Sequence, residues 1–191
     1  MWDRYNELIE KPMNSELKDI LHAILEKFHF AIIEQDLTDI FGENVLGAFD
    51  FLQKIVYLAL EGNRNAITDA EEFSHAFIKM MGARYRRQES REKFPENKLY
   101  SELRDMMEGT YFYAMVYDQY KNVYTYSDGT PDTARIKEEA LGKALAVALN
   151  DAWGRFQDEQ SKNFFRKLID WFNKAIDWMR SKIAGKKNAK E

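Results

Sequence analysis

The sequence has no cysteine among its 191 residues. Disulfides, thiolate metal sites, cysteine nucleophiles and iron–sulfur clusters are therefore excluded. Histidine is almost as rare, with His22, His29 and His75 only, so a metal site would have to rely largely on carboxylates. No run of about 18 apolar residues occurs, and the first ten residues are charged rather than apolar. We therefore predict no membrane span and no secretion signal, and expect a cytoplasmic protein.

Glycine and proline are also scarce, at nine and three residues. Hydrophobic residues make up 45% of the chain, which is typical of a folded globular protein. Apolar residues at helical spacing predict helices at 15–28, 67–81, 98–122 (broken near Gly109), 136–150 and 161–183. Gly82 is expected to end the second of these, and Thr130 with Pro131 to start the fourth, as N-cap and first helical residue. Short apolar runs at 30–33, 47–50 and 54–59 predict strands. The predicted fold class is mainly α (α+β), a helical domain with a small three-stranded sheet.

The charge of the chain is unevenly distributed. There are 28 Lys and Arg against 32 Asp and Glu, which gives a net charge of −4. Residues 161–191 carry nine basic and three acidic residues, a local charge of +6, so the rest of the chain carries −10. An acidic body does not favour a nucleic-acid partner. We expect instead a protein or peptide as substrate or binding partner.

The predicted helix at 67–81 carries the most informative motif. Glu71 and His75 are four residues apart and share one face of a helix, and Glu72 lies between them in sequence. Metallopeptidases use this spacing in a His-Glu-x-x-His helix, where two ligands hold a metal and the Glu polarises the metal-bound water. Zinc accepts carboxylate oxygen as well as imidazole nitrogen. A third ligand is expected from the helix at 136–150, where Glu139 or Glu138 is the candidate.

The order of these segments resembles a minimal zincin, the metallopeptidase fold of the ImmA/IrrE peptidases and of zincin-like domains in large phage and mobile-element proteins. The residues GAFD at 47–50 followed by KIVYL at 54–58 are similar to the edge-strand hairpin that precedes the active helix. The segment TDAEEFSHAF at 68–77 is similar to that helix, and EALGKALA at 139–146 to the third-ligand helix. The resemblance covers roughly residues 28–150.

This resemblance implies that Glu71, His75 and Glu139 are metal ligands for zinc or another divalent metal, with Glu72 as the catalytic base. A metal-bound water would then hydrolyse a peptide bond. The family has histidine where this chain has Glu71, so the motif is a degenerate Glu-Glu-x-x-His. The alternative is a non-catalytic protein-interaction module of phage or mobile-element origin that acts through its helical surface.

The candidate site residues also have structural interpretations. Thr68 and Glu71 match a capping box, in which the Glu side chain returns to the backbone of the capping residue. His75 lies between Phe73 and Phe77 and would then be an ordinary packed histidine. The tyrosine-rich stretch at 111–126 is interpreted as packing and surface.

The order of the predicted segments also suggests how the chain divides. We expect a zincin-like helical domain at 1–154 and an amphipathic C-terminal helix at 155–184, packed on that domain or on a partner. A disordered tail is expected at 185–191. The aromatic face of the C-terminal helix would also suit a homodimer.

Overall fold

A computed structural model describes residues 18–19, 22–23, 25–26, 29–41, 47–50, 53–60, 68–86, 95–150 and 153–187. This part of the chain is mainly helical with a small three-stranded mixed sheet, as predicted. The described residues of the predicted helix at 15–28 are helical. Among the described residues, no helix combines the length and the apolar character needed to cross a bilayer.

All three predicted strands are confirmed, with their ends shifted by at most one residue. They are β1 (Ala31–Glu34), β2 (Gly47–Asp50) and β3 (Ile55–Leu58). The sheet order is β1-β3-β2, with β1 parallel and β2 antiparallel to β3. In β3, Val56 and Leu58 are buried whereas Ile55 and Tyr57 are half-buried, because alternate side chains of a strand point to opposite faces.

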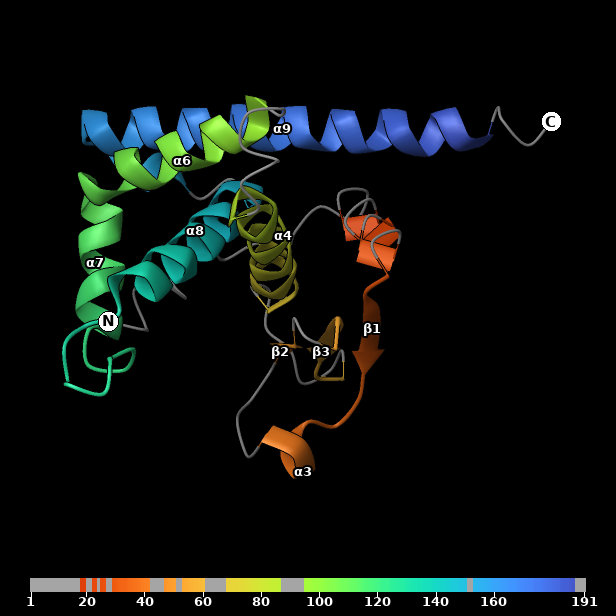
Figure 1. The fold of residues 1–191 in the computed structure, drawn as a ribbon, viewed down its shortest axis with the longest axis horizontal. Helices are drawn as coiled ribbons and strands as arrows, with labels where there is room; N and C mark the ends of the chain where they lie inside the picture. The colour runs from red at the N-terminus through yellow and green to blue at the C-terminus, as the bar shows by residue number, and fades with distance from the viewer. Residues whose placement is uncertain are drawn as a thin grey trace.

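The short helix α3 (Thr38–Phe41) lies beyond the sheet, on the side away from the long helices (Figure 1). The longer helices are α4 (Thr68–Arg86), α6 (Pro95–Glu108), α7 (Tyr111–Tyr120), α8 (Thr133–Leu149) and α9 (Glu159–Lys187), with a 3-10 turn, η2 (Trp153–Arg155), before α9.

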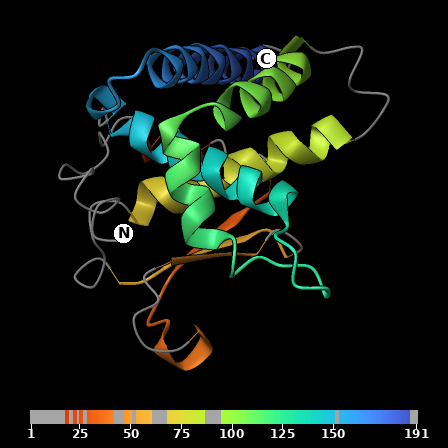
Figure 2. The same ribbon diagram turned by 90° about the vertical axis from the view of Figure 1, so that its left-hand side faces the viewer.

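Helices α4, α8, α6 and α9 form two layers above the sheet. Helix α4 packs on β2 and β3, and α8 packs on α4 (Figure 1). Helix α9 lies beside α6 in the outer layer, and Figure 2 shows the sheet on the opposite side of α4 from α9. The middle layer of α4 and α8 is thus covered on both sides, by the sheet and by α6 and α9.

Several predicted helix boundaries are shifted by a few residues, and two of these shifts have a clear cause. Gly82 was expected to end its helix, but α4 continues to Arg86, because one helical glycine costs only about 1 kcal/mol. Thr130 and Pro131 were expected to start the fourth helix, but Pro131 pairs with Thr125 in an isolated β-bridge and so remains extended. Asp132 caps α8 instead, since its side chain accepts a hydrogen bond from the Arg135 backbone N–H at 3.1 Å.

The predicted break near Gly109 is confirmed, because α6 ends at Glu108 and α7 begins at Tyr111. Thr110 caps α7 by accepting a hydrogen bond from the Tyr113 backbone N–H at 3.0 Å. At the C-terminal end, α9 extends to Lys187 and so includes residues 185–187, which were expected to belong to the tail.

Aromatic rings join the outer and middle layers. Phe77 of α4 packs edge-to-face on Trp171 and Phe172 of α9, with ring centroids 5.4 and 5.3 Å apart. All three side chains are buried, as are Leu168 and Ala175 on the same face of α9. The apolar face predicted for the last helix is therefore covered by the rest of the chain along its described side chains.

Candidate functional site

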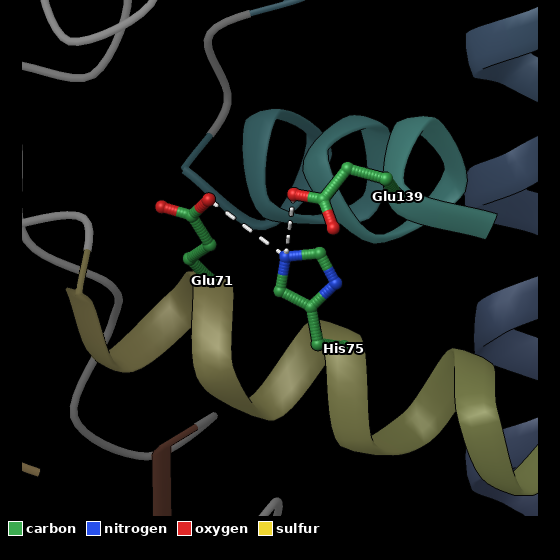
Figure 3. A group of neighbouring side chains, drawn as sticks. All are labelled: Glu71, His75 and Glu139. Carbon is green, nitrogen blue, oxygen red and sulfur yellow. Dashed lines mark ion pairs between the residues drawn. The ribbon is translucent and has the colours of Figure 1, made fainter. Parts of the chain in front are cut away.

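The candidate site lies where α4 crosses α8. The first two turns of α4 supply Glu71, Glu72 and His75, and the middle of α8 supplies Glu139. Figure 3 shows Glu71 and His75 on one face of α4, with Glu139 reaching toward them from α8. The helix thus provides the first pair through local geometry, and the helix crossing provides the third residue.

The carboxylates of Glu71 and Glu139 both lie close to the imidazole of His75. Its Nε2 lies 3.7 Å from Glu71 Oε1 and 3.5 Å from Glu139 Oε1 (Figure 3). One ligand atom from each residue lies within 4.8 Å of the other two. The three side chains are 16–18% exposed, so the cluster is largely buried but remains in contact with solvent.

Gly142 of α8 permits this close approach. A Cβ atom at this position would overlap the His75 ring at Nδ1 and Cε1, so a larger residue could not sit there without displacing the imidazole. The ring therefore presents Nδ1 to the backbone of α8 and Nε2 to the carboxylates. Small residues on both sides of Gly142, Ala140 and Ala144, are fully buried and favour a short distance between the helices.

Glu72 packs against the sheet beside the cluster. A Cβ added at Gly47, the first residue of β2, would lie 2.6 Å from Glu72 Cγ, so the absence of a side chain there makes room for the carboxyl group. Burial raises the pKa of Glu72 to about 7, against the opposing charge of His75. A carboxyl group with this pKa exists in both protonation states near neutral pH, as a general acid or base requires.

The other charges of the cluster are strongly coupled. Burial acts to raise the pKa of Glu71, but contacts with His75 and Lys143 outweigh it and hold the pKa at about 2. Burial acts to lower the pKa of His75, but the negative charges of Glu139 and Glu71 outweigh it and raise the pKa above its usual value. Glu71 is therefore a carboxylate at neutral pH, which suits a cation ligand.

Lys143 is the residue of this cluster that the sequence analysis missed. Its Nζ donates a hydrogen bond to Glu71 Oε1 at 2.5 Å and lies 3.6 Å from Glu139 Oε1, with 1% of the side chain exposed. The signal available in the sequence was a single lysine within the apolar run ALGKALAVAL, four residues after Glu139. Such a lysine must be buried with its helix and therefore needs an anionic partner.

Two tyrosines, Tyr120 and Tyr124, lie beside Glu139. Tyr124 donates a long hydrogen bond of 3.4 Å to Glu139 Oε2, and the Arg135 guanidinium lies 4.0 Å from the Tyr124 ring centroid. Burial, followed by the charge of Glu139, raises the pKa of Tyr124 to about 12 and also raises that of Tyr120. Both phenols therefore keep their protons, and Tyr124 helps to orient Glu139.

The structure distinguishes between the two candidates for the third ligand. Glu139 faces the cluster, whereas Glu138 pairs with Lys79 of α4 at 2.5 Å. Neighbouring residues of a helix point about 100° apart, so only one of the two carboxylates can face His75. Lys79 and Glu138 form a second ion pair between the same two helices, outside the cluster.

The donor set fits a divalent metal ion. Ligand atoms about 2.1 Å from a tetrahedral zinc lie about 3.4 Å from one another, close to the spacings of 3.7 and 3.5 Å at His75 Nε2. Two carboxylates and one imidazole also suit zinc or manganese. Lys143 is the one group that does not fit, because its ammonium lies beside the same oxygen atoms.

Comparison with protein-family models, with curated proteins and with solved structures returns no match to this chain. The resemblance to zincin-like domains therefore stays a prediction. Its support is the order of the three sequence segments and the geometry at the α4–α8 crossing.

Proposed function

We propose that the protein is a zincin-like, divalent-metal-dependent hydrolase of peptide bonds, with Glu71, His75 and Glu139 as metal ligands and Glu72 as the base. The observation that carries the proposal is the convergence of three ligand atoms from two helices within 4.8 Å of one another. Helix periodicity explains why Glu71 and His75 lie side by side on α4, but it does not explain why Glu139 of α8 lies beside them. A shared metal ion would explain this. A divalent ion in this site would supply Lewis-acid polarisation of a water molecule.

Glu72 is the residue proposed to move the proton. In its ionised form it accepts a proton from water, and the resulting oxygen nucleophile attacks the peptide carbonyl. Protonated Glu72 then donates the proton to the departing amine, which leaves one carboxylic acid, one amine and the regenerated carboxylate. Its pKa of about 7 makes both transfers feasible near neutral pH.

The position of β2 supports an extended peptide as the substrate. In the described sheet β2 is paired on one side only, with β3. Glu72 packs on Gly47 at the start of this strand. A peptide that pairs with the open edge of β2 would therefore run past Glu72 and the cluster, with its backbone held by strand hydrogen bonds.

A second candidate is the non-catalytic interaction module, and Lys143 is the observation that favours it. The buried ammonium already provides Glu71 with a cationic partner. In this case the charged cluster only joins α4 to α8, and the helical surface binds another protein. The two candidates differ in whether the cluster binds a metal.

The test is equilibrium dialysis of the protein against zinc or manganese, followed by mass spectrometry of the metal content on both sides of the membrane. The proposal expects one ion per chain in the wild type, and loss of that ion in His75→Ala and Glu139→Gln. Glu138→Gln is the matched control, because it removes the charge of the adjacent carboxylate outside the cluster. Absence of binding in the wild type at excess metal would leave the interaction module as the remaining candidate.

The catalytic step is tested with Glu72→Gln. The variant should retain the bound metal and lose about 10²–10⁴-fold in turnover of a peptide library, the usual contribution of a general base. A Glu72→Gln protein that cleaves peptides at the wild-type rate would contradict the proposed role of Glu72.

A further inference from the structure

The ammonium of Lys143 lies among the same atoms that would hold the metal. It is 2.5 Å from Glu71 Oε1 and 3.6 Å from Glu139 Oε1. These two oxygens are also the ones that approach His75 Nε2 at 3.7 and 3.5 Å. Lys143 and a divalent ion would therefore use the same carboxylate oxygens.

The two cations cannot occupy the site together in this arrangement. A metal ion bound to Glu71 Oε1 would lie about 2.1 Å from this oxygen, and the ammonium is only 2.5 Å from it. The ion and the lysine would then be close neighbours of like charge in a largely buried site, where the repulsion between charges is strong. One of them must leave.

An aromatic ring lies near the ammonium of Lys143 and offers it another favourable contact. Its Nζ lies 5.6 Å from the centroid of the Tyr120 ring, within the range in which a cation is attracted to an aromatic face. The lysine side chain has four flexible methylene groups, and the neighbouring Glu71 and Glu139 side chains are 16% and 18% exposed. We therefore expect the displaced ammonium to move past this ring to the solvent that contacts the cluster.

We propose that Lys143 is an internal competitor for the metal site: its ammonium fills the cation position between Glu71 and Glu139, and metal binding requires it to withdraw. The inference rests on the proposed function, because it concerns the occupancy of the same site. It explains how two carboxylates can be held in a buried cluster of the metal-free protein. It also predicts that the wild type binds metal more weakly than its ligand set alone would.

The first test compares zinc binding by isothermal titration calorimetry in the wild type, Lys143→Met and Lys79→Met. Methionine keeps the length and apolar character of the lysine stem and removes the charge. Lys143→Met should bind zinc at least about tenfold more tightly than the wild type, because one like charge is removed from the site. Lys79→Met is the matched control, since Lys79 bridges the same helices through Glu138, and its affinity should equal that of the wild type.

The outcomes separate this inference from the proposed function. Equal zinc affinity in the wild type and Lys143→Met overturns the competition and leaves the metal site standing. Absence of zinc binding in both proteins overturns the metal site itself, and the competition with it. If Lys143→Met binds zinc more tightly than the wild type and Lys79→Met does not, the result supports both the metal site and the competition.

A second measurement uses the wild-type protein and so does not depend on the folding of a variant. Lysines are labelled with an amine-reactive reagent, with and without saturating zinc, and the modified positions are identified by mass spectrometry. Lys143 is 1% exposed and should be protected without zinc, whereas Lys79 is 41% exposed and should react under both conditions. The inference expects Lys143 to become reactive when zinc binds. Protection of Lys143 at saturating zinc would overturn it.

Discussion

Two faces of α4 bury their side chains in different ways. One face places Glu71 and His75 against α8, where they meet Glu139 and Lys143. Another face places Phe77 among the aromatic rings of α9. The charged contact depends on distances and directions between particular atoms, whereas the aromatic contact depends mainly on removing apolar area from water. We therefore expect the aromatic face to contribute more stability and the charged face to provide specific chemistry.

The largest expected effect on stability is at the aromatic contact. Phe77→Ala removes a fully buried ring and should lower the free energy of unfolding by about 3–5 kcal/mol. Urea denaturation followed by circular dichroism measures the change. Phe41→Ala is the control, because Phe41 is 42% exposed and should cost less than about 1 kcal/mol. Equal losses in the two variants would show that α4 is not held by its contact with α9.

A smaller effect is expected where α8 touches His75. Gly142→Ala would normally stabilise a helix by about 1 kcal/mol. Here the new Cβ overlaps the His75 ring, so the variant should lose about 1–3 kcal/mol of stability and bind zinc more weakly. Gly154→Ala is the control, since no heavy atom beyond Gly154 and its two chain neighbours lies within 4 Å of the added Cβ. A Gly142→Ala protein that is more stable than the wild type would show that the ring moves aside at no cost.

The pH dependence of stability should come from the charged residues of α4. The folded protein binds a proton at Glu72 more tightly than the unfolded chain, since the pKa is raised from 4.5 to about 7. The free energy of unfolding should therefore fall as the pH rises through this interval. The raised pKa of His75 acts in the same direction, with its stabilisation present below 6.5 and lost as the pH rises through the folded pKa.

Denaturant titrations from about pH 5 to about pH 8 measure this dependence. Glu72→Gln should remove the contribution of Glu72 and flatten the profile. At more acidic pH the lowered pKa of Glu71 acts in the opposite direction, so stability should fall again as the pH drops from 4.5 toward 2. A profile that rises between pH 5 and pH 7 would contradict the protonation states assigned to the cluster.

The smallest effect is expected for the outer ion pair of the α4–α8 contact. Lys79→Ala removes a partner that is 41% exposed and should cost less than about 1 kcal/mol. Removal of the buried partner in Lys143→Met leaves Glu71 with His75 as its remaining close partner and should cost about 1–3 kcal/mol in the metal-free protein. Similar losses of stability in Lys79→Ala and Lys143→Met, measured by thermal or urea denaturation, would mean that the burial of an ion pair does not decide its contribution here.

Much of the fold could be predicted from local patterns. The short apolar run of β3 and the helical spacing in α4 are both local signals, so the strands and helices were found with small errors at their ends. The errors arose at the ends of helices. Pro131 could not start α8 because it is paired with Thr125, six residues earlier, a contact that helical spacing does not indicate.

The candidate site was predictable only in part. Glu71 and His75 share a face of α4 because they are one helical turn apart, and this follows from the sequence. The choice of Glu139 over Glu138 depends on the rotation of α8 about its axis, which is set by how it packs on α4. Lys143 was missed because the sequence does not show which anion a buried lysine will meet.

The sequence by itself determined the fold class, the three short strands, the helical faces and the pair of candidate ligands on α4, because each depends on residues within a few turns of one another. Tertiary structure alone decided that Glu139 and Lys143 enter the same cluster and that Gly142 brings the helices close enough for them to meet. These contacts join residues about 70 positions apart, as in the Lys143–Glu71 pair with a separation of 72. Their formation depends on the packing of whole helices, for which the local sequence carries no signal.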